Sequence, residues 1–257
     1  MLVRQMLREH AFLAIGYLGL LSVNFFGAIW FWPDLRQYLN ELTLLAKIVP
    51  MQIVQNLVYM VQEHGYWAYF GFQQLFKGAG MAGMIVAALL GSLMIAREVD
   101  NRTAEFLFSR PISRARLLLV RWATGLVLVI GPFWITTWIG VVASPLIDET
   151  VDASVVYWAT AYLSLFLAMI FTVTLAISTF ADHQLKPALI VIGFMFVNFA
   201  IYMVKTLNSY SLYKFIDLDR LIPMAEGIYP TWPAVSFGLI TLIALGIGIR
   251  RISTRDF

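Results

Sequence analysis

Cysteine is absent from this sequence, and charged residues are scarce. The first absence excludes disulfides, thiolate metal sites and cysteine nucleophiles together, and it leaves the cellular compartment open. Only 13% of the 257 residues are charged, whereas 60% are hydrophobic and the mean hydropathy is +0.78. A soluble domain of this length does not have such a composition. The sequence therefore predicts an integral membrane protein.

Sequence patterns for catalysis and nucleotide binding are missing as well. There is no Gly-x-x-x-x-Gly-Lys-Ser/Thr loop that would hold the phosphates of ATP. The three histidines, His10, His64 and His183, lie in different connecting segments and do not suggest a metal site. The apolar stretches are almost free of ionisable residues, which a reactive cluster or a coupling-ion site would need. We predict no catalytic residue, metal or cofactor in this chain, and we do not expect it to be an enzyme.

Apolar stretches long enough to cross a membrane recur along the whole chain. A hydrocarbon core of about 30 Å needs roughly 20 apolar residues per helix. The windows are 11–32, 73–96, 117–143, 155–180, 187–204 and 232–250. Their continuous apolar character excludes a β-barrel, whose strands alternate. We expect an all-α membrane protein with six spans in a single transmembrane domain, 1–257. The fifth span is the shortest, and Pro132 should kink the third without ending it.

The distribution of lysine and arginine predicts the orientation. With both termini on one side, that side carries twelve basic residues and the other carries six, among which we count Lys77. Because basic residues accumulate in cytoplasmic loops, both termini and the 97–116 segment are predicted to be cytoplasmic. The pI near 9.2 then reflects this topology, and we expect no nucleic-acid partner.

Three further segments are predicted to form helices outside the spans. Residues 1–10 have amphipathic spacing and predict an interfacial elbow helix that leads into the first span. Residues 33–72 and 205–231 are longer than simple connectors, and their apolar residues suggest external helices before the second and sixth spans. These external helices would either anchor the chain at the interface or form an external gate.

The 97–116 segment combines charges with an apolar patch. Asn101 or Thr103 can cap a short helix there, and Pro111 disfavours helix at Arg110, so the helix would last about two turns. Ser113 can cap the third span. The residues themselves leave two interpretations open: the aromatic side chains rest among lipid headgroups, or they fill a pocket in a partner protein.

The stretch IAREVDNRTAEFLFSRPISRARLLLVR, residues 95–121, resembles the signature region of type-2 ATP-binding-cassette (ABC) exporter permeases. The matching positions are Glu98, Thr103, Glu105, Leu107, Ser109, Pro111, Ser113 and Arg114. Six spans, cytoplasmic ends and external helices before the last span are also similar to this family, so the resemblance covers the whole chain. Two positions depart from it: Arg102 replaces a usual Gly, and Arg121 stands where many members have Lys.

The resemblance implies that the 97–116 segment contains a coupling helix that seats in a separate ATPase subunit. The docking residues would be Glu98, Thr103, Glu105, Phe106, Leu107, Phe108, Arg110, Pro111, Ser113 and Arg114. ATP and Mg²⁺ would be bound by two copies of that partner. A second permease copy or a sister permease would complete the path through the lipid. The expected location is a prokaryotic cell membrane, with cargo moving outward.

Within the spans, two kinds of residue have expected roles. Ala79, Gly83, Ala87 and Gly91 recur every four residues and predict a stripe where another helix packs closely. Asn24 and Asn198 carry amides that seek partners in hydrocarbon, so they could lie at a translocation or subunit interface. The scarcity of charge favours a hydrophobic or amphipathic cargo. The alternative function is an ATPase-coupled scaffold or signalling subunit that transports nothing.

Overall fold

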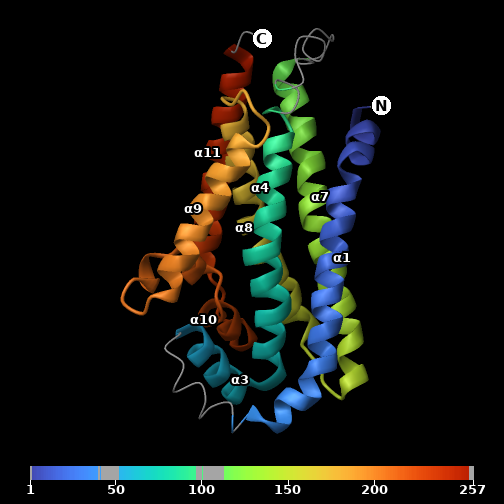
Figure 1. Cartoon of the computed structure of the whole chain (residues 1–257), viewed down its shortest axis with the longest axis vertical. Helices are drawn as coiled ribbons and strands as arrows, with labels where there is room; N and C mark the ends of the chain where they lie inside the picture. Colours follow the sequence, from blue (N-terminus) through green and yellow to red (C-terminus); the bar gives the residue numbers. More distant parts are fainter. Residues whose placement is uncertain (1, 40, 42–51, 97–99, 101–112, 255–257) are drawn as a thin grey trace.

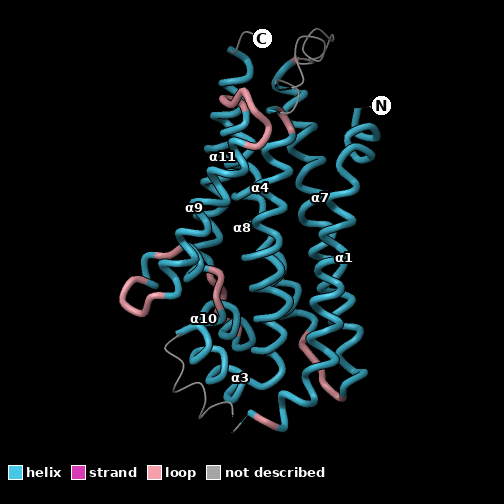
Figure 2. The backbone as a smooth tube through the Cα atoms, viewed as in Figure 1, coloured by secondary structure: helices cyan, strands magenta, loops and turns pink. Residues whose placement is uncertain are grey.

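The computed structural model describes residues 2–39, 41, 52–96, 100 and 113–254. The described residues are helical throughout, with short turns and no strand (Figure 2). The long helices are α1 (Leu2–Gln37), α3 (Gln52–Phe70), η1, a π-helix (Gly71–Gly83), α4 (Met84–Leu93), α7 (Arg114–Ala143), α8 (Ala153–Ser178), α9 (Lys186–Met203) and α11 (Thr231–Thr254). The short ones are η2 (Ser144–Ile147), η3 (Asn208–Tyr210), η4 (Leu212–Phe215), α10 (Leu218–Leu221) and η5 (Ile222–Glu226).

Six helices of the described chain are long and apolar enough to cross a membrane, as predicted. They form an elongated bundle with both termini at one end (Figure 1). We call this the terminal end, and the opposite end, where α3 and α10 lie, the distal end. The shortest span is α9, with 18 residues, and α7 continues through Pro132.

The start of the second span was predicted too late. The helix begins at Val54 rather than residue 73 and includes α3, η1 and α4. It bends at Gly65, whose φ of 58° lies in the left-handed region that glycine adopts readily. The sequence around Gly65 is polar enough to end a hydropathy window, but the backbone continues helical on both sides. Residues 66–72 are therefore helical and continuous with the second span, whereas their location outside the membrane stays a prediction.

The predicted elbow helix is helical but has no separate boundary. Helix α1 runs from Leu2 to Gln37 without interruption, so residues 2–10 continue directly into the first span. Their location at the membrane surface stays a prediction. Before the last span, the predicted short helices are present as η3, η4, α10 and η5.

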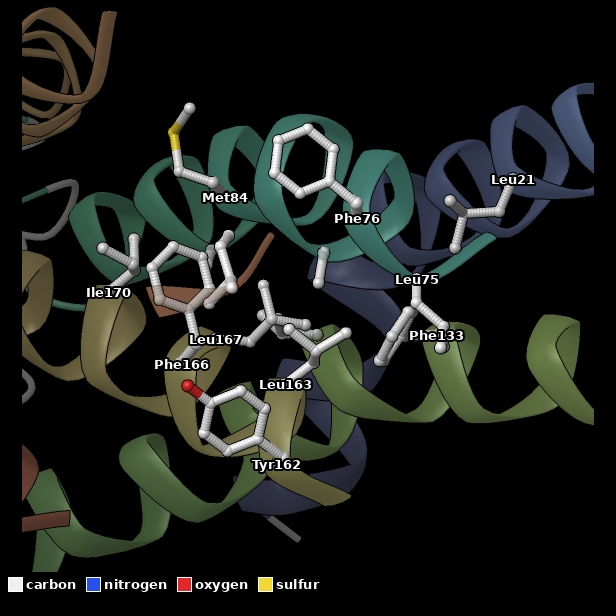
Figure 3. Close-up of a cluster of buried hydrophobic side chains, with 14 of the residues drawn as sticks. Leu21, Leu75, Phe76, Met84, Phe133, Tyr162, Leu163, Phe166, Leu167 and Ile170 are labelled. Carbon is white, nitrogen blue, oxygen red and sulfur yellow. The ribbon is translucent and has the colours of Figure 1, made fainter. Parts of the chain in front are cut away.

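Helix α8 forms the centre of the bundle. Of its most apolar window, 72% of the residues are buried, compared with 17% for α11. Phe166, Leu163 and Leu167 of α8 pack with Leu75 and Phe76 of η1 and Phe133 of α7 (Figure 3). Lipid is as apolar as these neighbours, so the central place of α8 is stabilised by close packing rather than by its apolar character.

The outer helices carry large apolar side chains on their exposed faces. Phe12 and Trp30 of α1 are 84% and 85% exposed, and Leu242 of α11 is 66% exposed. Such continuous apolar surface is stable when it faces lipid or another membrane helix. The long spans and these faces together place the bundle in a membrane.

Candidate functional site

The predicted docking segment lies mostly outside the described residues. This applies to Glu98, Thr103, Glu105, Phe106, Leu107, Phe108, Arg110 and Pro111. Ser113 and Arg114 are described at the start of α7, at the terminal end of the bundle. The Ser113 hydroxyl accepts a hydrogen bond from the Arg116 amide at 3.3 Å, which is the cap that the sequence predicts.

Two arginines in the first turns of α7 donate hydrogen bonds to backbone carbonyls of neighbouring spans. Arg114 donates to the Ile252 carbonyl of α11 at 3.4 Å. Arg121 is buried and donates to the Met94 carbonyl at the end of the second span. A guanidinium presents several donors in a fixed geometry, which suits it to binding free carbonyls at a helix end. The third span is thereby held in place next to the residues that enter and leave the 97–116 segment.

Asp100, within that segment, pairs with the connection between α8 and α9. Its carboxylate lies 3.1 Å from Nδ1 of His183 and accepts a hydrogen bond from the Gln184 amide at 3.2 Å. The Ser92 hydroxyl donates to the Gln184 carbonyl. Asp100 is not among the predicted docking residues, because no local pattern relates it to His183, which is 83 positions away. A displacement of Asp100 would therefore also displace the connection between α8 and α9.

A polar group lies inside the second span, where the sequence analysis expected none. Lys77 was counted with the outer connecting segments, but the structure places it in η1, within the membrane helix. Its ammonium donates to Oε1 of Gln73 at 2.7 Å and lies 6.0 Å from the centre of the Phe72 ring. The Asn24 amide of α1 donates to the Gln73 carbonyl at 3.0 Å. The run Gln-Gln-Leu-Phe-Lys before an apolar stretch was the signal that could have identified it.

The charge of Lys77 has no acidic partner among the residues that the structure describes. A lysine at the centre of a membrane helix costs about 2.5–3.5 kcal/mol on insertion scales. Such residues are rare, and they usually mark a path or a binding site for a ligand. The π-helix that carries Lys77 is also a rare conformation that is frequent at functional sites.

The two asparagines singled out from the sequence do not bond to each other. Asn24 binds η1, as described above, and Asn198 is buried at the distal end. Oδ1 of Asn198 accepts from the Leu212 amide at 3.2 Å, and its carbonyl accepts from the Ser211 hydroxyl at 2.8 Å. Asn198 thus holds the chain after α9 against that helix. A role for either residue at a translocation or subunit interface stays a prediction.

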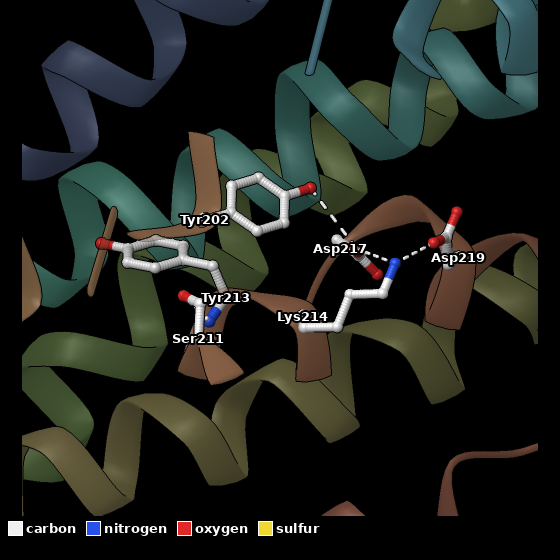
Figure 4. A network of polar contacts seen from close by, with 6 residues as sticks. All are labelled: Tyr202, Ser211, Tyr213, Lys214, Asp217 and Asp219. Carbon is white, nitrogen blue, oxygen red and sulfur yellow. Dashed lines mark hydrogen bonds and ion pairs between the residues drawn. The ribbon is translucent and has the colours of Figure 1, made fainter. Parts of the chain in front are cut away.

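The same distal segment contains a buried ionic network (Figure 4). Lys214 donates to Oδ2 of Asp217 at 3.1 Å and also to Asp219. The Tyr202 hydroxyl of α9 donates to Asp217 at 3.4 Å. The other oxygen of Asp217, Oδ1, has no hydrogen-bond partner among the described residues, and Asp217 is one of the residues that line a cavity of about 10 Å³. That volume holds about one water molecule.

Burial makes Asp217 sensitive to pH. Desolvation, with the nearby charge of Asp219, raises the pKa of Asp217 from 3.8 to about 6, although Lys214 opposes this. Because the pKa in the fold exceeds the ordinary value, stability from this group is greatest at low pH and is lost as the pH rises through about 6. We expect the free energy of unfolding to fall by about 1 kcal/mol between pH 5 and 7.

The measurement is the thermal midpoint of the purified chain in detergent at both pH values. Asp217→Asn should remove most of the pH dependence. Glu226→Gln, an exposed acid at the same end, should retain it. An unchanged pH dependence in Asp217→Asn would assign it to other groups, such as the histidines.

The four residues of the small-residue stripe are all buried at contacts between spans. A Cβ atom on Gly83 would lie 2.6 Å from the Tyr17 hydroxyl of α1 and 2.8 Å from Leu167 of α8. On Gly91 it would lie 2.6 Å from the Phe171 carbonyl of α8. Ala79 and Ala87 are fully buried. Small side chains thus allow the backbones of the second and fourth spans to approach closely.

The described part of the chain also contains one large apolar groove. An apolar groove of about 460 Å³ lies between α8 and α11 and is lined by Trp158, Ala161, Tyr162, Leu165, Met224, Tyr229, Pro230, Thr231 and Ala234. Within the described ranges, no three His, Asp or Glu side chains gather as metal ligands would. The groove matches hydrocarbon, since its lining is almost entirely apolar.

Five membrane helices around a central sixth, α8, with a polar group inside the second span and hydrogen-bonded helix ends at the terminal end, define a polytopic membrane protein. Residues 3–218 match the family model of the ABC-2 family transporter protein, and the chain belongs to this family. The match ends before α11, the last span. A comparison with curated proteins finds no match. Permeases of this family work with ATP-binding partner subunits.

Proposed function

We propose that this chain is the permease subunit of an ABC exporter, driven by ATP hydrolysis on a separate ATPase subunit. Membership of the ABC-2 transporter family carries the proposal. The six membrane helices support it, since they form the membrane part of a transporter. ATP and Mg²⁺ would bind to two copies of the ATPase, and a second permease copy or a sister permease would complete the path across the cell membrane.

Coupling would run through the 97–116 segment and the helices fastened to its ends. Closure of the ATPase subunits around ATP would move this segment. Asp100 would pass the movement to the connection between α8 and α9, and Arg121 would pass it to the second and third spans. The permease pair would then open outward. Force can be transmitted along this route only through contacts that stay intact during the movement. The contacts of Asp100 and of Arg121 both involve a charged side chain, and charge-assisted hydrogen bonds are stronger than neutral ones.

The direct test is purification of the tagged chain from membranes of its own cells. We expect an ABC ATPase to co-purify. Proteoliposomes containing the complex should move an amphipathic fluorescent probe in an ATP-dependent manner, in the direction that corresponds to export. ATPase association without flux of any probe would favour the scaffold or signalling alternative. Absence of an associated ATPase would contradict both functions.

A variant at Asp100 tests the coupling route separately from docking. Asp100→Ala removes the partner of His183 and the acceptor for the Gln184 amide. We expect the ATPase to remain bound, while the amount of probe moved per ATP hydrolysed falls several-fold. Asp34→Ala removes an exposed carboxylate near the distal end of α1 and should leave this ratio unchanged. Equal ratios in the two variants would exclude Asp100 from coupling.

A further inference from the structure

The second span carries a line of partly exposed residues that begins at the Lys77 group. Its members are spaced four residues apart and are Gln73, Lys77, Met81, Ile85, Leu89 and Leu93. We call this line the track. The residues beside it on the same helix, such as Ala79, Ala87 and Leu90, are fully buried. The track is therefore a part of the second span that is accessible to a molecule in the membrane, next to the partly exposed Ala82 and Val86.

The two ends of the track differ in chemistry. From Met81 to Leu93 every member is apolar, and this part extends about 18 Å at the rise of an α-helix. At the distal end, Lys77 contributes an ammonium and Gln73 an amide, and the Asn24 amide is bonded beside them. Asn24 precedes the exposed Trp30 by six residues, or roughly 9 Å along α1. If Trp30 lies at the interface, the ammonium sits within the distal leaflet.

Charge complementarity selects the occupant. The ammonium has a neutral amide partner and no carboxylate within ion-pair distance in the described part of the chain. A ligand with an anionic group would supply the missing countercharge, and charge-assisted hydrogen bonds to an ammonium are stronger than neutral ones. An apolar tail on the same ligand would cover Met81 to Leu93. A cationic or wholly apolar molecule would leave Lys77 without a countercharge.

We propose that the track binds an exported anionic amphiphile, with its carboxylate or phosphate at Lys77 and Gln73 and its tail along Met81 to Leu93. This inference rests on the proposed function, because it names the class of cargo that the permease moves. Gln73 orients the ammonium through its 2.7 Å contact, and Asn24 fixes the backbone of Gln73 against α1. The anionic group is recognised in the distal leaflet, from which outward release requires a short further movement.

Chemical protection of the wild-type chain tests the site without relying on a variant. The complex in phosphatidylcholine nanodiscs is treated with an amine-acylating reagent, and modification is quantified by mass spectrometry at Lys77 and at the exposed Lys205. We expect dodecyl phosphate to slow acylation of Lys77 several-fold and to leave Lys205 unchanged. Dodecyltrimethylammonium and dodecyl maltoside should protect neither lysine. Equal protection by all three amphiphiles, or by none, would overturn the proposal.

Variants of Lys77 then test whether its positive charge is needed for binding of the anionic amphiphile. Lys77→Gln should weaken binding of dodecyl phosphate by about tenfold or more, whereas Lys77→Arg should largely retain it. Lys205→Gln makes the same charge change at an exposed position and should have no effect. If Lys77→Gln does not insert into the membrane, the Lys77→Arg variant and the protection experiment still test the proposed binding site. Unchanged affinity in Lys77→Gln would contradict the assignment.

A final experiment distinguishes binding of an exported molecule at Lys77 from binding of a structural lipid. Nanodiscs containing phosphatidylglycerol are compared with and without ATP. Loss of Lys77 protection when ATP is added would support an exported molecule at the site. If phosphatidylglycerol protects Lys77 and neither ATP nor dodecyl phosphate changes this protection, the bound molecule is a structural lipid and the proposal is overturned. Binding is also measured on the chain alone. A missing ATPase would therefore contradict the proposed function, whereas absent protection with an associated ATPase would contradict only this inference.

Discussion

Replacing Phe106 and Phe108 by alanine is expected to abolish association of the ATPase subunit while leaving membrane insertion intact. Burying one phenylalanine side chain stabilises a complex by about 1.5–3 kcal/mol. Loss of two rings would then weaken the affinity by roughly 10²- to 10⁴-fold. Both positions fall outside the predicted apolar windows, so the substitutions should leave the membrane-inserting stretches unchanged. The measurement is the amount of ATPase that co-purifies with the tagged chain.

A matched control is available within α9. Phe194 and Phe196 have the same spacing and are 57% and 58% exposed on a span. Phe194→Ala with Phe196→Ala should leave co-purification of the ATPase normal. If the Phe106 and Phe108 variant also co-purifies normally, the aromatic patch is not a docking element. That result would favour the alternative in which these rings rest among lipid headgroups.

Substitution of Gly91 is expected to cause the largest loss of stability among single changes in the spans. The Cβ of an alanine at this position would lie 2.6 Å from the Phe171 carbonyl and 3.1 Å from the Leu175 amide nitrogen. Both are backbone atoms of α8, so a side-chain rotation cannot relieve the contact. Overpacking of this kind costs about 1–3 kcal/mol. We expect Gly91→Ala to lower the thermal midpoint by several degrees and Gly91→Leu to prevent accumulation of folded protein.

Gly246 of α11 provides the comparison, because a Cβ built there meets no atom within 4 Å. Gly246→Ala and Gly246→Leu should leave the midpoint unchanged or slightly raised, since alanine and leucine favour helix more than glycine does. Equal midpoints for Gly91→Ala and Gly246→Ala would show that the second and fourth spans separate without cost. The close packing of α4 on α8 would then be unimportant for stability.

Several features of the fold were accessible from the sequence because they depend on local composition. Hydropathy over about 20 residues predicted all six spans, and Ser113 was correctly predicted to cap α7. The even number of spans also required both termini at one end, as Figure 1 shows. The same local method placed the start of the second span at residue 73, whereas the helix that leads into this span already begins just after the kink at Gly65.

Residues of the candidate site were less predictable. Lys77 falls within the predicted window 73–96 but was counted with the outer basic residues, since a lysine near a window edge is ordinarily placed in water. Asp100 and His183 are 83 positions apart, and Asn198 binds a segment that returns to α9 through an irregular turn. The spacing of apolar residues cannot predict such contacts, because it describes one helix at a time.

By itself, the sequence determined the class of protein, the number of spans and the resemblance to ABC exporter permeases that the family match confirms. These properties follow from the cost of exposing polar backbone to lipid and from a local motif, so neighbouring residues suffice to specify them. The tertiary structure alone decided that Gln73, beside Lys77, bonds to Asn24 of the first span, that Asp100 contacts the connection between α8 and α9, and that Asp217 is buried. Those outcomes depend on which helices pack together, and packing brings into contact residues that are distant in the chain.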